Sequence, residues 1–320
     1  MFGMVVEELN RLWSQQKRVH GLMGNPKFRY VWNELLYYAN AQLNEQPIGS
    51  TMRIGNALMT HIPRSISAIL DIPTEDGMIY RSGISYTSFA DACAKCPTAT
   101  LNRLKTGGAI TFGGRSYQPA GGIWISEIYG RAYVEWLISV LPPGLILSTN
   151  PVFRYDGYWV KGVSQEINPI SSQPSVTSDA GLFADIASGT AYVDPFNIGV
   201  GAGQEVDLGA SARSDLQAAV NAKRSWFAIG LQSPDNECPC AADVDDRSGI
   251  YTKEWSGVNP PPTLYVEFDF PGPPTPPGST MTDTQAVSSG SRHIETPYIP
   301  YSISLTTDRI LRHVTKRVRG

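Results

Sequence analysis

Residues 50 to 270 consist of short β-rich runs separated by glycine and proline, and this pattern constrains the fold more than any other feature of the sequence. The runs are rich in Val, Ile, Tyr, Phe and Trp, as in GMIYRSG (77–83), GAITFGG (108–114) and SWFAIGL (225–231). Such residues pack well on a pleated sheet, while glycine and proline mark the turns between strands. Helical patterns do not alternate with the runs, which disfavours a parallel α/β architecture. The pattern predicts a mainly-β fold, an antiparallel jelly-roll β-sandwich over residues 50–270.

The last run closes this sandwich. Apolar and polar side chains alternate over residues 264–268, directly after three prolines at 260–262. This period of two predicts a half-buried strand. Because the first and last strands of a jelly roll commonly lie antiparallel, we expect it to pair with the first strand, around residues 77–81. One helix is expected within the sandwich, where Ser214 caps a turn or two carrying Leu216, Ala219 and Val220.

Residues 1–49 are predicted to form a helical anchor segment. Apolar residues recur at helical spacing in two stretches, which Gly24, Asn25 and Pro26 separate. The apolar stripe includes Trp13, Trp32 and Leu35, and two short helices cannot bury such a stripe between themselves. The stripe therefore packs either on the sandwich, as a cover of its core, or on another subunit, as an assembly anchor.

The C-terminal part separates into a linker and an arm. PGPPTPPGST (271–280) is a stiff proline-rich linker, and residues 281–320 form an extended basic arm that cannot build a core by itself. Such an arm is either frayed or ordered by pairing with a neighbouring subunit. Its basic side chains either face encapsidated nucleic acid or an acidic groove of a neighbour, or they are merely solvated. They include Arg309, Arg312, Lys316 and Arg317.

Composition narrows the possible partners. The 320 residues are 42% hydrophobic, which suffices for a sizeable core, and the formal net charge of −3 gives no general attraction to nucleic acid or membranes. The N-terminus lacks the basic start, apolar run and cleavage site of a signal peptide, and no apolar stretch approaches the ~18 residues of a membrane span. We expect a protein that folds in a cytoplasm and has no membrane partner.

Four segments, taken in order, resemble the landmarks of a known domain. They are DGMIYRSG (76–83), GRAYVEWLISVLPPGLILS (130–148), VDLGASARSDLQAAVNAKRSWFAIGLQS (206–233) and IYTKEWSGVNPPPTLYVEF (250–268). Together they resemble a DNRLRE-type β-sandwich domain, over roughly residues 73–270. The resemblance implies a non-catalytic jelly roll, similar to carbohydrate-binding modules, of a kind found in bacterial surface proteins and phage virion proteins. The chain lacks the motif that names the family and has no export signal, and the second departure favours a virion protein.

The four cysteines fall into two close pairs, Cys93 with Cys96 and Cys238 with Cys240. If the first and last strands pair as expected, the loops that carry these cysteines lie at one end of the sandwich and the four thiols converge. A Cys-x-x-Cys and a Cys-x-Cys supply the four thiolates of a closed structural zinc site. Disulfides across the two loops are the alternative, and free thiols are the third.

The segment DNECPCAADVDDRSG (235–249) is rich in carboxylates. Its acidic residues are Asp235, Glu237, Asp243, Asp245 and Asp246. Carboxylates this close together suit a calcium site in a loop, but their spacing differs from that of an EF-hand. The segment therefore predicts either a calcium site or a solvated acidic loop.

Trp255, in a polar loop, is the candidate for stacking on a sugar ring, since tryptophans within predicted strands, such as Trp136 and Trp159, are expected in the core. Catalysis finds no support in the pattern. His20, His61, His293 and His313 are scattered without a nucleophile or a metal-ligand partner at a meaningful spacing. We predict no catalytic residues and no required cofactor.

These observations favour a non-catalytic structural protein of the virion of a tailed phage or similar virus. We expect it to decorate the capsid or belong to the neck, tail or fibre, and to assemble with copies of itself and other virion proteins through its terminal extensions. The alternative is a carbohydrate- or receptor-binding module of a spike, fibre or cell surface, with a host glycan as its partner.

Overall fold

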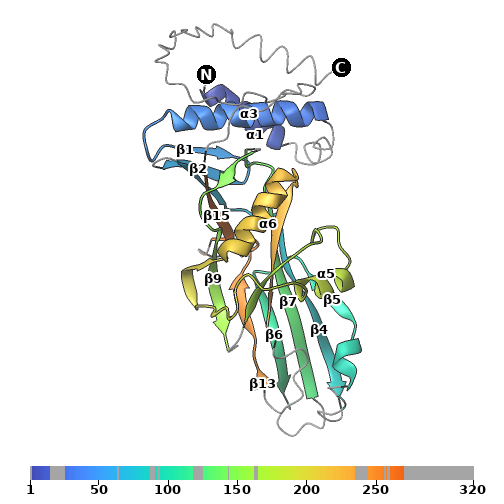
Figure 1. The fold of residues 1–320 in the computed structure, drawn as a ribbon. Coiled ribbons are helices and arrows are strands. Elements are labelled where there is room, and N and C mark those ends of the chain that lie inside the picture. Colours follow the sequence, from blue (N-terminus) through green and yellow to red (C-terminus); the bar gives the residue numbers. More distant parts are fainter. Residues whose placement is uncertain are drawn as a thin grey trace, which may run out of the picture. The chain divides into compact units, whose positions relative to one another are not determined.

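The computed structural model describes residues 2–14, 26–62, 65–86, 91, 94–117, 125–142, 144–161, 165–234, 244–255, 257 and 260–269 (Figure 1). The chain divides into two compact units. One contains Met1–Ala39, and the other, the β unit, spans Asn40–Gly272. The division falls inside a helix, and each unit is described by itself.

Two helices make up the described part of the first unit. α1 spans Phe2–Trp13, and α3 spans Pro26–Asn44 and continues past the division. Proline is well suited to the start of α3, because its fixed φ matches the first helical turn, where its missing N–H costs nothing. The rings of Trp13 and Trp32 stack with their centroids 6.4 Å apart, and both side chains are buried. The predicted helix pair is confirmed. No helix among the described residues is both long and apolar enough to span a membrane.

The β unit contains fifteen strands among its described residues, and every pairing between them is antiparallel. The strands are β1 (Thr51–Ile54), β2 (Ala57–Ile62), β3 (Ser65–Leu70), β4 (Glu75–Tyr86), β5 (Leu101–Leu104), β6 (Ala109–Tyr117), β7 (Ile125–Leu137), β8 (Ile146–Leu147), β9 (Val152–Val160), β10 (Glu166–Pro169), β11 (Gly201–Asp207), β12 (Trp226–Gln232), β13 (Val244–Asp245), β14 (Ser248–Tyr251) and β15 (Thr263–Asp269). The predicted mainly-β antiparallel fold is confirmed. Its jelly-roll connectivity stays a prediction.

The strands form two layers that share β6. One layer has the order β1-β2-β3-β15-β9-β14, and residues 109–112 of β6 pair with β14 at its end. In the other layer, residues 113–117 of β6 pair with β7, which also pairs with β4 and β12. The change occurs at Gly113, whose φ of +93° is left-handed. A Cβ there would collide with the carbonyl oxygen of Asp246, so the crossing between the layers requires glycine.

The main core lies between the two layers. Trp136 of β7 is fully buried, and its ring meets the ring of Phe153 of β9 edge to face, with centroids 5.9 Å apart. Its indole N–H donates to the carbonyl oxygen of Pro262, at the entrance to β15. Trp136 therefore joins both layers through one side chain, in agreement with its predicted place in the core.

Two helices pack on the β unit. α6 (Gly209–Asn221) contacts β12 and β8, and it buries Leu216, Ala219 and Val220 as expected. Ser214 lies inside this helix, whose N-cap is Leu208, so the predicted capping role is wrong. α5 (Asp179–Ile186), which the sequence did not predict, lies against β4, β5, β7 and β12 (Figure 1).

The closing strand has different neighbours from those expected. β15 has the predicted alternation, with Leu264, Val266 and Phe268 fully buried. It pairs with β3, β9 and β8, whereas β4, the strand at residues 77–81, pairs with β5 and β7 in the other layer. The expected pairing of residues 264–268 with residues 77–81 is therefore wrong. The hairpin β2–β3 takes the place beside β15 that was assigned to β4.

Replacing Trp136 by alanine should lower the free energy of unfolding of the β unit by ~3–5 kcal/mol, because it leaves a large cavity between the layers. Chemical denaturation followed by circular dichroism measures this. Ile146→Ala is the matched control: Ile146 is 64% exposed, so its truncation should change stability by no more than ~0.5 kcal/mol. Equal losses for the two variants would contradict the assignment of the core.

Candidate functional site

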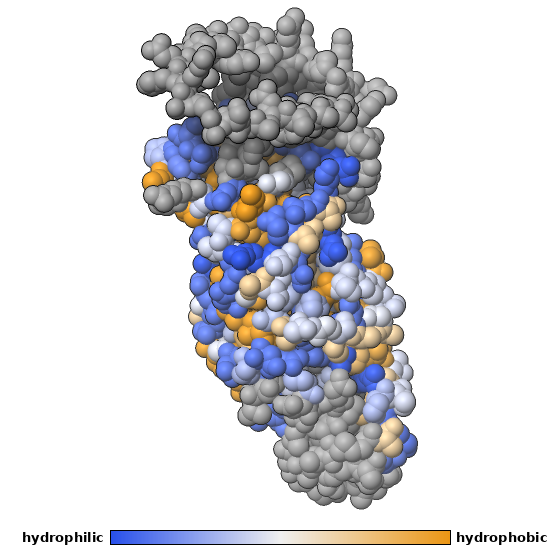
Figure 2. Space-filling view, viewed as in Figure 1, coloured by the Kyte–Doolittle hydropathy of each residue, from blue (hydrophilic) through white to orange (hydrophobic). Residues whose placement is uncertain are grey.

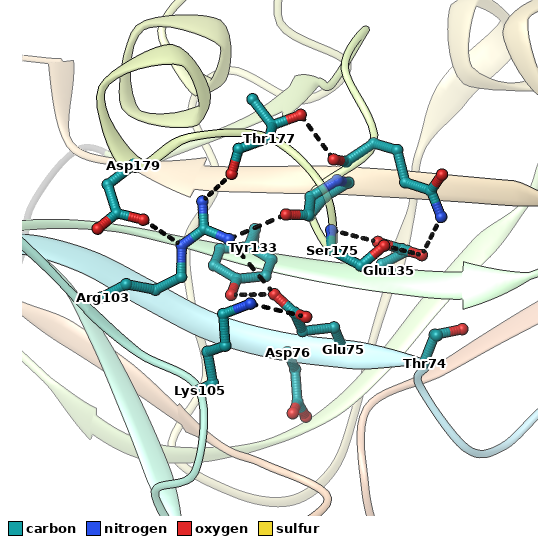
Figure 3. A network of polar contacts seen from close by, with 12 residues as sticks. Thr74, Glu75, Asp76, Arg103, Lys105, Tyr133, Glu135, Ser175, Thr177 and Asp179 are labelled. Atoms are coloured by element: carbon teal, nitrogen blue, oxygen red, sulfur yellow. Dashed lines mark hydrogen bonds and ion pairs between the residues drawn. The ribbon is translucent and has the colours of Figure 1, made fainter.

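The outer face of the β4–β7 pair carries a network of polar side chains (Figure 3). Glu75 lies directly opposite Glu135, and Gly77 lies opposite Tyr133, so these side chains share one face of the sheet. The Tyr133 hydroxyl donates to Glu75 over 2.7 Å. A Cβ on Gly77 would come within 2.8 Å of that hydroxyl, so the glycine makes room for the tyrosine. The neighbouring strand β5 adds Arg103 to the same face.

Arg103 fastens the segment before α5 to this face. Its guanidinium donates to the carbonyl oxygens of Pro174 (2.9 Å) and Thr177 (2.7 Å). Its Nε also lies 2.8 Å from a carboxylate oxygen of Asp179, and Nη1 lies 3.6 Å from Glu75. Only 7% of the Arg103 side chain is exposed, so its hydrogen bonds to the two carbonyl oxygens are shielded from water, whereas 44% of the Asp179 side chain is exposed. A planar fork of donors suits this arrangement, and a lysine would not reproduce it.

Glu135 is fully buried and accepts hydrogen bonds from the same segment. The backbone N–H of Ser175 and the side-chain amide of Gln173 both donate to it over 3.0 Å. Burial raises the pKa of Glu135, and these hydrogen bonds oppose the rise. Burial and the neighbouring Glu75 also raise the pKa of Tyr133. The carboxylates of Glu75 and Glu135 thus have donors within the fold, and Glu135 and Arg103 hold residues 173–179 on the sheet.

Asp76 projects from the opposite face of β4, toward the interior between the layers. It is 1% exposed and accepts a hydrogen bond from the backbone N–H of Lys253 over 2.9 Å. Its other carboxylate oxygen is buried without a hydrogen bond and lies 4.0 Å from Nζ of Lys253. Burial is the main cause that raises the pKa of Asp76, to about 7. Asp76 is therefore a buried carboxylate whose charge changes near neutral pH.

Three aromatic side chains form a row on the outer surface of the other layer. Tyr158 comes from β9, Tyr251 from β14, and Trp255 from the turn that follows β14. The ring centroids of Tyr158 and Tyr251 are 5.4 Å apart, and those of Tyr251 and Trp255 are 4.6 Å apart. Tyr158 is 45% exposed and Trp255 is 39% exposed. We call these three residues the aromatic row; it contains the residue predicted to contact sugar.

Of the cysteines, the described residues include only Cys96. It is buried and engaged in a disulfide bond, and its carbonyl oxygen accepts a hydrogen bond from Arg81. Cys93, Cys238 and Cys240 lie outside the described residues. In the structure Cys96 thus supplies no thiolate to a zinc ion, while the state of the other three cysteines stays a prediction.

The acidic segment is described only at Asp245 and Asp246, which point to opposite sides of the chain. Asp245 lies near Arg247 (2.8 Å), Lys161 (3.4 Å) and Arg115 (3.9 Å). Burial would raise its pKa, but the hydrogen bond and charge of Arg247 outweigh this and lower it. Asp246 is buried and accepts from the Ser233 hydroxyl over 2.6 Å.

The structure therefore does not bring Asp245 and Asp246 together. The other members, Asp235, Glu237 and Asp243, lie outside the described residues, and within those residues no cluster of three or more potential metal ligands occurs. The calcium site stays a prediction.

The proposed assembly residues are placed only in part. Trp13, Trp32 and Leu35 are buried in the single chain, so any assembly role for them passes through the helices they hold together. Arg309, Arg312, Lys316 and Arg317 lie outside the described residues. Their roles stay predictions.

Sequence reasoning missed the polar network, although part of its signal was present. In RAYVEWL (131–137), alternation places Tyr133 and Glu135 on one face and Val134 and Trp136 on the other. A carboxylate within so apolar a run indicates a buried partner. No sequence rule identifies Arg103 as the residue that meets this face.

Arg103→Met should lower the free energy of unfolding by ~3–5 kcal/mol, because it leaves the buried carbonyl groups of Pro174 and Thr177 without their donor. Denaturant titration measures the loss. Arg53→Met is the matched control, since Arg53 pairs with Asp71 at the surface with 46% of its side chain exposed. Its loss should not exceed ~1 kcal/mol. Similar losses for both variants would contradict the fastening role of Arg103.

No known family model matches this chain, and no curated protein shows significant similarity to it. Its function has to be argued from its own geometry.

Proposed function

We propose that the protein is a non-catalytic structural component of a virion, made in a host cytoplasm, which assembles with copies of itself and with other virion proteins. The observation that carries this proposal is the division of the chain into two compact units, one of them helical and one a β-sandwich-like unit. A separate helical unit suits docking on a particle, while the β unit projects from it or tiles its surface.

The charged side chains beneath the segment before α5 also support a structural role, because they contact other groups of the fold. Glu75, Arg103 and Glu135 have partners in the segment before α5 or on the sheet beneath it. A pair of buried carboxylates is a frequent acid–base device in enzymes, but such a device needs access to a substrate. Here Glu135 lies beneath residues 173–179 and binds them, while Glu75 is held by Tyr133, Lys105 and Arg103.

The sheet edges provide places for strand addition. β1 forms the end of its layer in the sheet order, and its exposed side chains Thr51 and Arg53 alternate with the buried Met52 and Ile54. An extended segment of another copy can add to such an edge through main-chain hydrogen bonds. On the face of the β unit seen in Figure 2, apolar side chains are scattered among hydrophilic ones. This face favours edge pairing over a broad apolar interface.

Full-length protein should form assemblies of defined mass, whereas a chain limited to the β unit, residues 40–272, should remain monomeric. Light scattering at matched concentrations measures both masses, and circular dichroism confirms that the shorter chain is folded. A monomeric full-length protein, or assembly of the shorter chain alone, would contradict assembly through the terminal extensions.

The aromatic row favours a second candidate function, the binding of carbohydrate. Sugars combine apolar C–H faces with hydroxyl groups, and a ligand of this kind suits rings that carry their own polar groups. The rings of Tyr158 and Trp255 are partly exposed, and both tyrosines of the row carry a hydroxyl group. We therefore propose a host glycan as the ligand of the aromatic row.

Full-length protein should bind at least one glycan on a printed array of host and bacterial surface glycans. Trp255→Ala and Tyr158→Ala should each weaken that binding at least about tenfold, or ~1.4 kcal/mol. Tyr38→Ala is the matched control, since Tyr38 is 41% exposed but lies on α3, and it should bind as the original protein does. Absence of binding, or binding that survives both row variants, would contradict this function.

A further inference from the structure

The turn that carries Trp255 is tied to two other parts of the β unit. Within the turn, the backbone N–H of Trp255 donates to the carbonyl oxygen of Thr252 over 3.1 Å. The backbone N–H of Thr252 donates to Gly108 over 3.2 Å, and the Thr252 hydroxyl donates to Gly107. The second tie comes from Lys253, whose ammonium donates to the carbonyl oxygen of Thr74 over 2.6 Å. These contacts fix the place of the indole at the end of the aromatic row.

Asp76 takes part in the second tie. Its carboxylate accepts the backbone N–H of Lys253, and Thr74 lies two residues before it on the same chain. Lys253 is thus held by its backbone and its side chain at the start of β4. The backbone of Lys253 cannot move away without exposing the carboxylate of Asp76 to water. The position of the turn and the burial of this carboxylate are therefore coupled.

The charged and titratable groups around Asp76 define how this coupling responds to pH. Burial is the largest cause of the raised pKa of Asp76, which is about 7. The hydrogen bond and the charge of Lys253 lower the pKa, while the nearby Glu254 raises it, and Asp76 in turn raises the pKa of Tyr133. When the turn lifts, the carboxylate is hydrated, and its pKa returns toward the ordinary value of ~3.9.

The direction of the response follows from linkage. As pH rises, the state in which Asp76 has the lower pKa becomes more favourable. Asp76 has its lower pKa when the turn is lifted and the carboxylate is hydrated. Lifting becomes more favourable between pH ~4 and pH ~7, where the lifted form has lost its proton and the closed form still holds it. Above pH ~7 both forms are ionised and the equilibrium levels off. The turn is fastened most firmly in acid.

We propose that Asp76 is a positioning residue for the aromatic row: it holds the Thr252–Trp255 turn in place and loosens it as pH rises toward neutrality. It touches no ligand itself and acts through Lys253. The hold of Asp76 on the turn does not depend on carbohydrate binding. Only the use of that hold, to position the aromatic row for a sugar, rests on the proposed carbohydrate-binding function. The hold on the turn is measurable without any ligand.

Hydrogen–deuterium exchange of full-length protein tests the proposal, with Asp76→Asn as the comparison. Asparagine has nearly the same shape and still accepts the Lys253 N–H, but it has no charge at any pH. Exchange of the amides of residues 249–257 should be similar in the two proteins at pH 5. At pH 7.5 the original protein should exchange faster than the variant, and the ratio of the two rates should grow at least tenfold from pH 5 to pH 7.5. A ratio that is the same at both pH values would overturn the proposal.

Asp71→Asn is the matched control, because Asp71 pairs with Arg53 at the surface. It should leave exchange in residues 249–257 unchanged at both pH values. If Asp76→Asn does not fold, the amide resonance of Lys253 in the ¹⁵N-labelled original protein serves instead. Its chemical shift should titrate with a midpoint near pH 7, and a midpoint near pH 4 would overturn the proposal.

The glycan array is run in parallel at pH 5 and pH 7.5 to separate the two proposals. If exchange follows the expected pattern but no glycan binds at either pH, the carbohydrate-binding function fails and the role of Asp76 in holding the turn stands. If a glycan binds through Trp255 while the exchange ratio is flat, the role of Asp76 fails and the function stands.

Discussion

The register between β4 and β7 is the constraint on which the rest of the β unit depends. Because Glu75 lies opposite Glu135, every second residue of both strands is committed to one side of the sheet. The inner side receives Asp76 and Trp136, and the outer side receives the polar network and the surface under α5. A slip of one residue would exchange the two sets. It would bury the network carboxylates between the layers and expose Trp136.

The two sides of this strand pair use buried charge differently. On the outer side, Glu135 and Arg103 meet backbone groups of residues 173–179, so polar contacts hold an irregular segment that has few apolar side chains of its own. On the inner side, Asp76 holds a turn that ends in a partly exposed tryptophan. Burial raises the pKa of Asp76 to about 7, so the inner contact changes with pH near neutrality.

The sequence allowed us to predict those features that depend on local patterns of residues. The helices around Trp13 and Trp32, the antiparallel strands and the place of Trp136 in the core follow from periodicity. The neighbours of β15 did not follow, because pairing depends on contacts between distant segments, and the hairpin β2–β3 was not recognised as a competitor of β4. Arg103 and Asp76 were missed for the same reason. Their partners lie about 71 to 177 residues away along the chain, where no spacing rule applies.

Arg103 and Asp76 differ in what they hold. Arg103 holds the segment before α5 through two carbonyl oxygens and the carboxylate of Asp179. A buried carboxylate with one oxygen left without a hydrogen bond costs stability, and a chain keeps such a cost where it supports a site. Asp76 meets this description, and its single backbone partner leads directly to the turn of Trp255. The loss of stability at Asp76 and the exposed ring of Trp255 therefore have one explanation: the buried carboxylate holds the turn that carries the exposed ring.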